Sequence, residues 1–192
     1  AVACGPKVSD KTTLEGSFGE GAPESVNIKI QEMDIDTTVA VTDGKFAVEL
    51  PANKAIFAVL TADGVRARFI PDGTPLTFSV NEEGAGEITS KTPAVSVQEK
   101  YKAYVDTMIK LEKDARAKLE ALGDAAADSA RSEIINAYDA AVSECDKKAF
   151  EENKDNALGA SVFGNLQYDL APAQVDSMLN LLDQSLLETK GI

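Results

Sequence analysis

The chain has 192 residues, of which 44% are hydrophobic and 27% are charged, a composition typical of a globular protein with one ordinary domain or two small ones. Its formal net charge is −13, and it contains no histidine. The basic residues form no stripe along the sequence, which argues against nucleic acid or an anionic membrane surface as a partner bound through side-chain charge. The lack of histidine excludes a Ser-His-Asp triad and a His-based zinc site.

The first five residues, Ala1-Val2-Ala3-Cys4-Gly5, are small residues around a single cysteine. Small residues before a cleavage site are typical of signal peptides, and a cysteine at this place is typical of a bacterial lipoprotein. We therefore expect Cys4 to be the lipid-attachment site, with residues 1–11 as lipoprotein N-terminus and tether. This predicts a periplasm-facing membrane lipoprotein of the cell envelope, in the outer membrane rather than the inner. The alternative is that Cys4 carries no lipid and is free to pair with Cys145.

Residues 12–92 have the pattern of short strands. The segments 26–30, 46–50, 65–70 and 76–80 alternate apolar with polar residues, the period of half-buried strands. The segment Ala55–Leu60 is almost entirely apolar, which predicts a central strand covered on both sides. Seven or eight such strands predict an antiparallel β-sandwich domain over residues 12–92.

Three Asp-Gly dipeptides separate these segments: Asp43-Gly44, Asp63-Gly64 and Asp72-Gly73. Asp and Gly tolerate the positive φ that two-residue hairpin loops require. We therefore expect a tight hairpin turn at each of the three.

Residues 93–192 have a helical period instead. Apolar residues recur at steps of three or four between Tyr101 and Leu122 and again between Ala130 and Ala149, which predicts two helices in an antiparallel hairpin. Gly123 is expected to end the first helix and Asp124 to cap the second. A third helix is expected from about Ala157 to Tyr168. A fourth is expected from Pro172 to Leu186. The fold class is thus α+β: an N-terminal antiparallel β-sandwich followed by a helical hairpin and two further helices.

Three side chains in the helical region are candidates for a functional role. Tyr101 and Tyr104 are suited to a sugar-stacking platform or a partner surface, although their spacing beside Met108 and Leu111 favours a place in the core. Cys145 lies on the apolar phase of its helix, so a buried, small hydrophobic residue is expected. No Cys-x-x-Cys is present, so the segment has no motif for dithiol–disulfide exchange.

The two halves together resemble the N-terminal region of thioredoxin-like envelope lipoproteins of Bacteroides-type bacteria. The chain ends at Gly191-Ile192 soon after the fourth expected helix, so we expect it to be cut from a longer protein. The residues that carry the resemblance are Ala3-Cys4-Gly5, Leu14-Glu15-Gly16, Asp43-Gly44-Lys45-Phe46, Pro71-Asp72-Gly73-Thr74-Pro75-Leu76, the stretch from Glu152 to Gly159, and Tyr168-Asp169-Leu170-Ala171-Pro172.

The resemblance implies a role in cell redox homeostasis. It also implies that the catalytic Cys-x-x-Cys belongs to a C-terminal thioredoxin-like domain that follows residues 93–192 in the whole protein. Cys4 is then the one matching functional position, and no catalytic residue, metal or cofactor is expected. We expect a non-catalytic module that acts as a spacer, a dimerisation surface or a client-interaction surface, with the thioredoxin-like domain as its covalent partner. The alternative is a ligand-binding β-sandwich lipoprotein for a glycan or peptide.

Overall fold

The computed structural model describes residues 7–125 and 127–186. The chain divides into two compact units. The first contains the described residues up to Lys102, together with Asp155–Ala157 and residues 184–186. The second contains Ala103–Lys154 and Leu158–Asp183.

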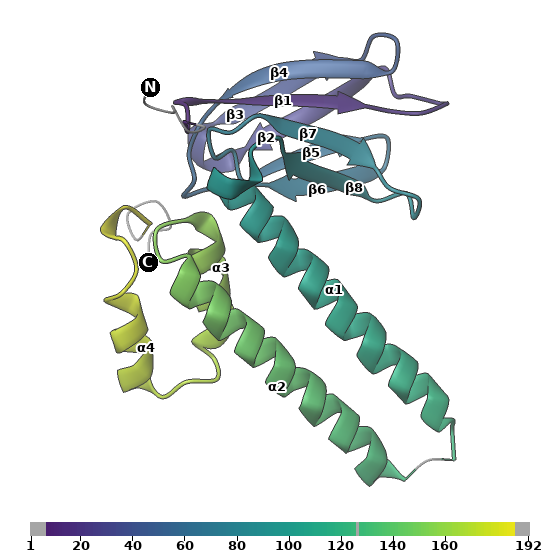
Figure 1. Cartoon of the computed structure of the whole chain (residues 1–192), viewed down its shortest axis with the longest axis vertical. Coiled ribbons are helices and arrows are strands. Elements are labelled where there is room, and N and C mark those ends of the chain that lie inside the picture. Colours follow the sequence, from purple (N-terminus) through teal and green to yellow (C-terminus); the bar gives the residue numbers. More distant parts are fainter. Residues whose placement is uncertain (1–6, 126, 187–192) are drawn as a thin grey trace, which may run out of the picture. The chain divides into compact units, whose positions relative to one another are not determined.

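The first unit is a β-sandwich of two four-stranded sheets (Figure 1). One sheet has the strand order β4-β1-β7-β8 and the other β3-β2-β5-β6. All neighbouring strands are antiparallel except β1 and β7, which run parallel. The strands are β1 (Lys11–Ser17), β2 (Ser25–Ile30), β3 (Ile35–Ala40), β4 (Lys45–Pro51), β5 (Ala58–Ala62), β6 (Val65–Phe69), β7 (Leu76–Val80) and β8 (Gly86–Ser90), with a 3₁₀ turn over Gln31–Met33.

The sandwich core is formed by the inward-facing residues of both sheets. Strand β1 alternates between exposed and buried positions along its whole length, as a strand with one solvated face does. At one end of the core, the rings of Phe18, Phe46 and Phe78 contact one another at centroid distances of 5.2–6.1 Å. Gly16 leaves room for this cluster, because a Cβ there would lie 2.1 Å from Cε1 of Phe46. The predicted sandwich is confirmed.

Two of the three Asp-Gly dipeptides form the predicted hairpin turns. Asp43 and Gly44 have φ angles of 51° and 73°, and Asp63 and Gly64 have 44° and 85°. Two successive positive φ angles define the turn whose twist matches that of paired strands.

Two predictions within the sandwich were wrong. Asp72-Gly73 lies between β6 and β7, which belong to different sheets, so the segment crosses between sheets instead of closing a hairpin. Gly73 has a positive φ angle, but Asp72 is not among the described residues that have one, so the two do not form the turn with two successive positive φ angles. The other error concerns Ala55–Leu60: its first three residues form a buried turn and β5 starts at Ala58, where inward and outward positions alternate again.

The helical region begins with a 3₁₀ turn over Pro93–Val95, followed by α1 (Val97–Leu122) and α2 (Asp128–Glu152). The part of α1 that lies in the second unit runs beside α2 as the predicted hairpin (Figure 1). Gly123 follows α1 with a φ of 70°, as expected for a residue that ends a helix. Asp124 does not cap α2, whose N-cap is Ala127.

The apolar stripes of the hairpin are only half-buried. The stripe residues between Leu111 and Leu122 on α1, and between Ala130 and Ala141 on α2, form the less exposed face of these parts of the two helices. None of these stripe residues is fully buried. Full burial on α2 is confined to Asp146, Ala149 and Phe150 near its C-terminus. Cys145, directly before Asp146, is half-buried, not buried as predicted.

Two shorter helices, α3 (Ala157–Leu166) and α4 (Pro172–Leu179), follow. Phe163 of α3 packs against Phe150 of α2 with ring centroids 6.3 Å apart. Helix α4 starts with Pro172 in its first turn, as predicted, but it ends at Leu179 and not at Leu186, because a turn at Asn180 and Leu181 and a bend at Leu182 interrupt it.

Candidate functional site

The crossing segment between β6 and β7 contains a buried carboxylate, Asp72, which is 4% exposed. Its Oδ1 accepts hydrogen bonds from the backbone N–H and the hydroxyl of Thr74, at 3.0 and 2.7 Å. Its Oδ2 accepts from the Ser96 hydroxyl at 2.7 Å and from the Gln98 backbone N–H at 2.9 Å. The carboxylate therefore joins its own turn to the first turn of α1, where negative charge also interacts favourably with the helix dipole.

The side chains of the first turn of α1 continue this network into the sandwich. Ser96 caps the helix by accepting a hydrogen bond from the Glu99 backbone N–H. Gln98 accepts from Ile70 N–H at 2.7 Å and donates to the Ile88 carbonyl at 2.8 Å. Since Gln98 is 2% exposed and both of its amide groups are satisfied within the first unit, the start of α1 is an integral part of the sandwich.

The same crossing segment also holds the N-terminal tether. The Gly73 carbonyl accepts a hydrogen bond from Ser9 N–H at 2.9 Å, and Gly73 N–H donates to the Thr12 hydroxyl at 2.8 Å. A Cβ at Gly73 would lie 2.2 Å from the Ser9 carbonyl oxygen, so the close approach of the two backbones requires glycine. The tether and the first helix therefore meet at two successive residues, Asp72 and Gly73.

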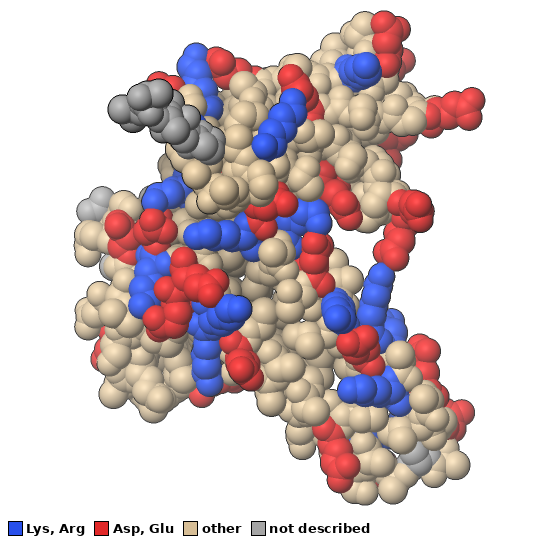
Figure 2. Space-filling view, in the orientation of Figure 1, with Lys and Arg blue, Asp and Glu red and all other residues tan. Residues whose placement is uncertain are grey.

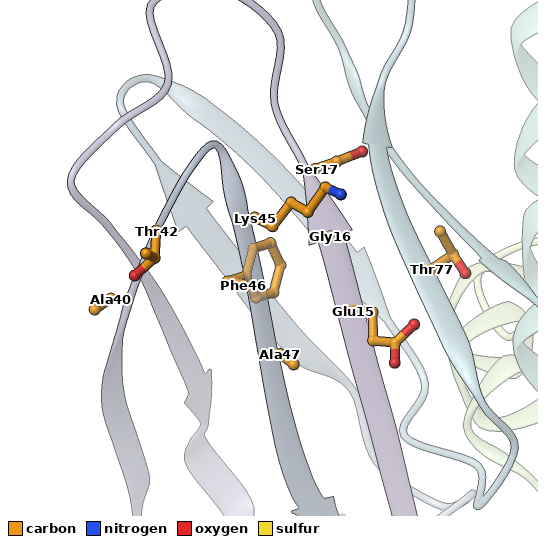
Figure 3. A pocket seen from close by; sticks show the side chains of 9 residues that line it. All are labelled: Glu15, Gly16, Ser17, Ala40, Thr42, Lys45, Phe46, Ala47 and Thr77. Atoms are coloured by element: carbon orange, nitrogen blue, oxygen red, sulfur yellow. The ribbon is translucent and has the colours of Figure 1, made fainter.

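An open depression of about 600 Å³ lies over β1 and β4 (Figure 3). Residues at and after the end of β3 border it on one side. Within it the carboxylate of Glu15 is 2.6 Å from Nζ of Lys91, and this ammonium lowers the pKa of Glu15 by hydrogen bonding and charge. Figure 2 shows acidic and basic side chains interspersed over the face drawn there. The depression is lined by Glu15, Gly16, Ser17, Ala40, Thr42, Lys45, Phe46, Ala47 and Thr77.

The two candidate tyrosines have different surroundings. Tyr101 is half-buried in the first unit, where its ring meets Phe57 edge-on at a centroid distance of 5.1 Å. Burial raises the pKa of Tyr101, and the neighbouring Arg68 guanidinium opposes that rise. Tyr104 is half-buried in the second unit, where its hydroxyl donates to Oδ1 of Asp146 at 2.7 Å.

Asp146 and Cys145 are adjacent titratable groups near the end of α2. Burial raises the pKa of Asp146, although hydrogen bonds from Tyr104 and Asn165 partly offset the rise. Burial, and then the charge of Asp146, raise the pKa of the Cys145 thiol. A thiol needs its thiolate form to attack, so this environment disfavours nucleophilic chemistry at Cys145.

Cys4, the expected lipid-attachment site, lies outside the described residues. Within residues 7–125 and 127–186, no cluster of three or more His, Cys, Asp or Glu side chains is arranged to hold a metal ion. No helix in this part of the chain combines the length and apolar character needed to cross a membrane.

The sequence reasoning missed the role of Asp72 entirely. A signal was present: Asp72 is two residues before Thr74, and an aspartate that accepts from the backbone N–H two residues later forms a common turn of its own. The link from Asp72 to Ser96 and Gln98 spans more than twenty residues, and no local pattern contains it.

No family model matches the chain, and no curated protein matches it. Assignment of a function therefore rests on the site geometry and the sequence pattern.

Proposed function

We propose that the chain is a non-catalytic module of a membrane-anchored, thioredoxin-like envelope lipoprotein. In this proposal Cys4 carries the lipid, and the sandwich with its helices sets the position of a C-terminal redox domain. The module also offers a surface for dimerisation or client proteins. The protein would act at the periplasmic side of the cell envelope, attached to the outer membrane rather than to the inner one.

The observation that carries the proposal is the shared attachment of tether and helix to one turn. Gly73 holds Ser9, and Asp72 holds the first turn of α1 through Ser96 and Gln98. A module that transmits position from an anchor to a following segment needs such a rigid connection. Hydrogen bonds to a buried carboxylate are suited to it, because they are stronger than those between neutral groups.

The length of the tether limits how far the sandwich can lie from the anchor. Ser9 is hydrogen-bonded to the sandwich and lies five residues after Cys4. A fully extended chain spans at most about 3.6 Å per residue, so the distance from Cys4 to Ser9 is at most about 18 Å. A lipid on Cys4 would hold the sandwich close to the membrane surface.

The chemistry of the described residues supports a non-catalytic role. Cys145 is half-buried, and its pKa is raised above the ordinary thiol value. The other cysteine, Cys4, is the expected lipid carrier. Neither has the second cysteine at two-residue spacing that dithiol exchange motifs use.

Two measurements test this proposal together. In insulin reduction with dithiothreitol, the isolated chain should not accelerate precipitation, and Cys145→Ser should behave like wild type. In a host that lipidates proteins, the natural full-length protein should sediment with membranes, whereas its Cys4→Ser variant should remain in the soluble fraction. Catalysis by the isolated chain, or membrane association without Cys4, would refute the proposal.

A second candidate function, ligand binding by the sandwich, is favoured by the depression in Figure 3. Lys45 and Thr42 at its border are exposed. A glycan or peptide held there should shift the NMR signals of Ala47 and Thr77 on titration. Unchanged signals across a glycan and peptide panel would count against this candidate.

A further inference from the structure

The outer face of the sheet β3-β2-β5-β6 carries three exposed cations in a strongly acidic chain. Lys29 on β2 and Arg68 on β6 lie in one cross-strand row, because each is opposite Val59 of β5. Arg66 lies in the next row of β6, opposite Thr61. With strands about 4.8 Å apart, the Cα atoms of Lys29 and Arg68 are about 10 Å apart.

Lys29 and Arg66 differ in their partners from two cations on or beside the other sheet, Lys11 and Lys91. On the sheet β4-β1-β7-β8, Lys11 is paired with Glu49 at 2.6 Å, and Lys91, just beyond β8, is paired with Glu15. Within the described part of the chain, neither Lys29 nor Arg66 has a carboxylate within 4.0 Å. Their charge is therefore available to an anionic ligand.

The third cation, Arg68, is held in place by aromatic rings. Its guanidinium carbon lies 3.5 Å from the centroid of the Phe57 ring, as in a cation–π contact. Tyr101 meets the same Phe57 ring edge-on, so the ring that holds the guanidinium is itself packed against a second aromatic side chain. A fixed guanidinium loses less entropy on binding a carboxylate than a free one does.

Side chains that hydrogen-bond hydroxyl groups lie between and beside the cations. Asn27 of β2 is opposite both Thr38 of β3 and Thr61 of β5, so the three form a row of amide and hydroxyl groups. The carboxylate nearest to them in register is Asp36, opposite Lys29, and its Oδ1 accepts from Nδ2 of Asn27 at 2.7 Å. Asp36 lies on the edge strand β3, so it borders this polar face at one side.

We infer that the outer face of β3-β2-β5-β6 binds a linear acidic polysaccharide, with sugar carboxylates on Lys29, Arg66 and Arg68 and sugar hydroxyls on Asn27 and Thr61. Charge complementarity selects this occupant. A single polysaccharide chain is narrow enough to follow the two rows that contain the cations, in which Asp36 at the edge strand is the carboxylate in register, whereas a wider membrane surface would meet more of a chain whose net charge is −13. This site is separate from the spacer role and does not depend on it.

The test uses the full chain and polygalacturonate, a polymer of uronic acid, with binding measured by calorimetry. Binding is expected at about 10 mM salt and should be lost at about 500 mM salt, where charge is screened within about 4 Å. The double variant Lys29→Gln, Arg66→Gln should bind at least about tenfold more weakly, because charge-assisted bonds are lost at two sites. Lys45→Gln, at an exposed cation of the other sheet, is the matched control and should bind within about twofold of wild type.

Further ligands separate this inference from its competitors. Uncharged dextran and vesicles of phosphatidylglycerol should both fail to bind the wild-type chain. Binding of polygalacturonate that is equally reduced in Lys45→Gln, or no binding at low salt, would overturn the inference. Binding to the anionic vesicles that depends on Lys29 and Arg66 would also overturn it, in favour of a membrane contact.

Discussion

Replacing Asp72 by Asn tests whether the buried carboxylate joins the sandwich to α1. The substitution preserves the size of the side chain and one oxygen, so the two bonds from Thr74 can persist. On the other side it places an amide NH₂ where Ser96 and Gln98 now donate. The Ser96 hydroxyl can rotate to accept from the new amide, but the Gln98 backbone N–H cannot.

The size of the effect follows from these contacts. A buried N–H left without an acceptor costs about 1–3 kcal/mol. Loss of a negative charge at the start of α1 adds about 0.3–1 kcal/mol. We therefore expect Asp72→Asn to lower the free energy of unfolding of the first unit by about 1–4 kcal/mol.

The assay is urea unfolding followed by circular dichroism, with amide hydrogen exchange to locate the effect. Asp63→Asn is the control, because Asp63 is exposed at a φ of 44° that asparagine also tolerates, and its effect should stay within about 0.5 kcal/mol. Exchange at the Gln98 and Glu99 amides should become faster in Asp72→Asn alone. Wild-type stability and protection in that variant would refute the role given to the carboxylate.

Two further predictions concern the second unit. Gly159→Ala should destabilise this unit by about 3 kcal/mol in urea unfolding, because the new Cβ would lie 1.8 Å from the Asn153 carbonyl oxygen. Gly164→Ala in the same helix is the control: its new Cβ meets nothing within 4 Å, so the change should be neutral or stabilising by up to about 1 kcal/mol. Equal effects of the two changes would contradict this prediction. Burial raises the pKa of Asp146, so the folded state binds the Asp146 proton more tightly than the unfolded state does. The free energy of unfolding of the wild type should therefore rise as the pH falls from the folded-state pKa of Asp146 to the ordinary aspartate pKa of 3.8. Asp146→Asn should lack that part of the rise, and identical stability–pH curves would refute the assignment.

Much of the fold follows from local patterns in the sequence. The alternation in β2 and β4, and the dipeptides Asp43-Gly44 and Asp63-Gly64, each determine a strand or turn within a few residues, so they could be predicted. The helical stripe beginning at Tyr101 was predicted in the same way. Its incomplete burial was not, because the period of a helix says which face is covered but not by how much.

The features that were not predicted depend on contacts between distant segments. Asp72-Gly73 has the composition of a hairpin turn, yet its carboxylate binds the start of α1. Lys29 and Arg66 belong to separate hairpins, and β5 between them brings their charges onto one face. The first arrangement depends on a contact between a loop and a helix more than twenty residues away, and the second depends on pairing of strands that are not adjacent in sequence.

Mass spectrometry of the Cys4 peptide, from the protein purified out of its native membranes, is the most direct test of the central proposal. A lipoprotein module should yield an N-terminal peptide in which the Cys4 sulfur carries a diacylglyceryl group, with Cys145 recovered as a free thiol. An unmodified Cys4, or a disulfide between Cys4 and Cys145, would contradict the membrane-anchored role.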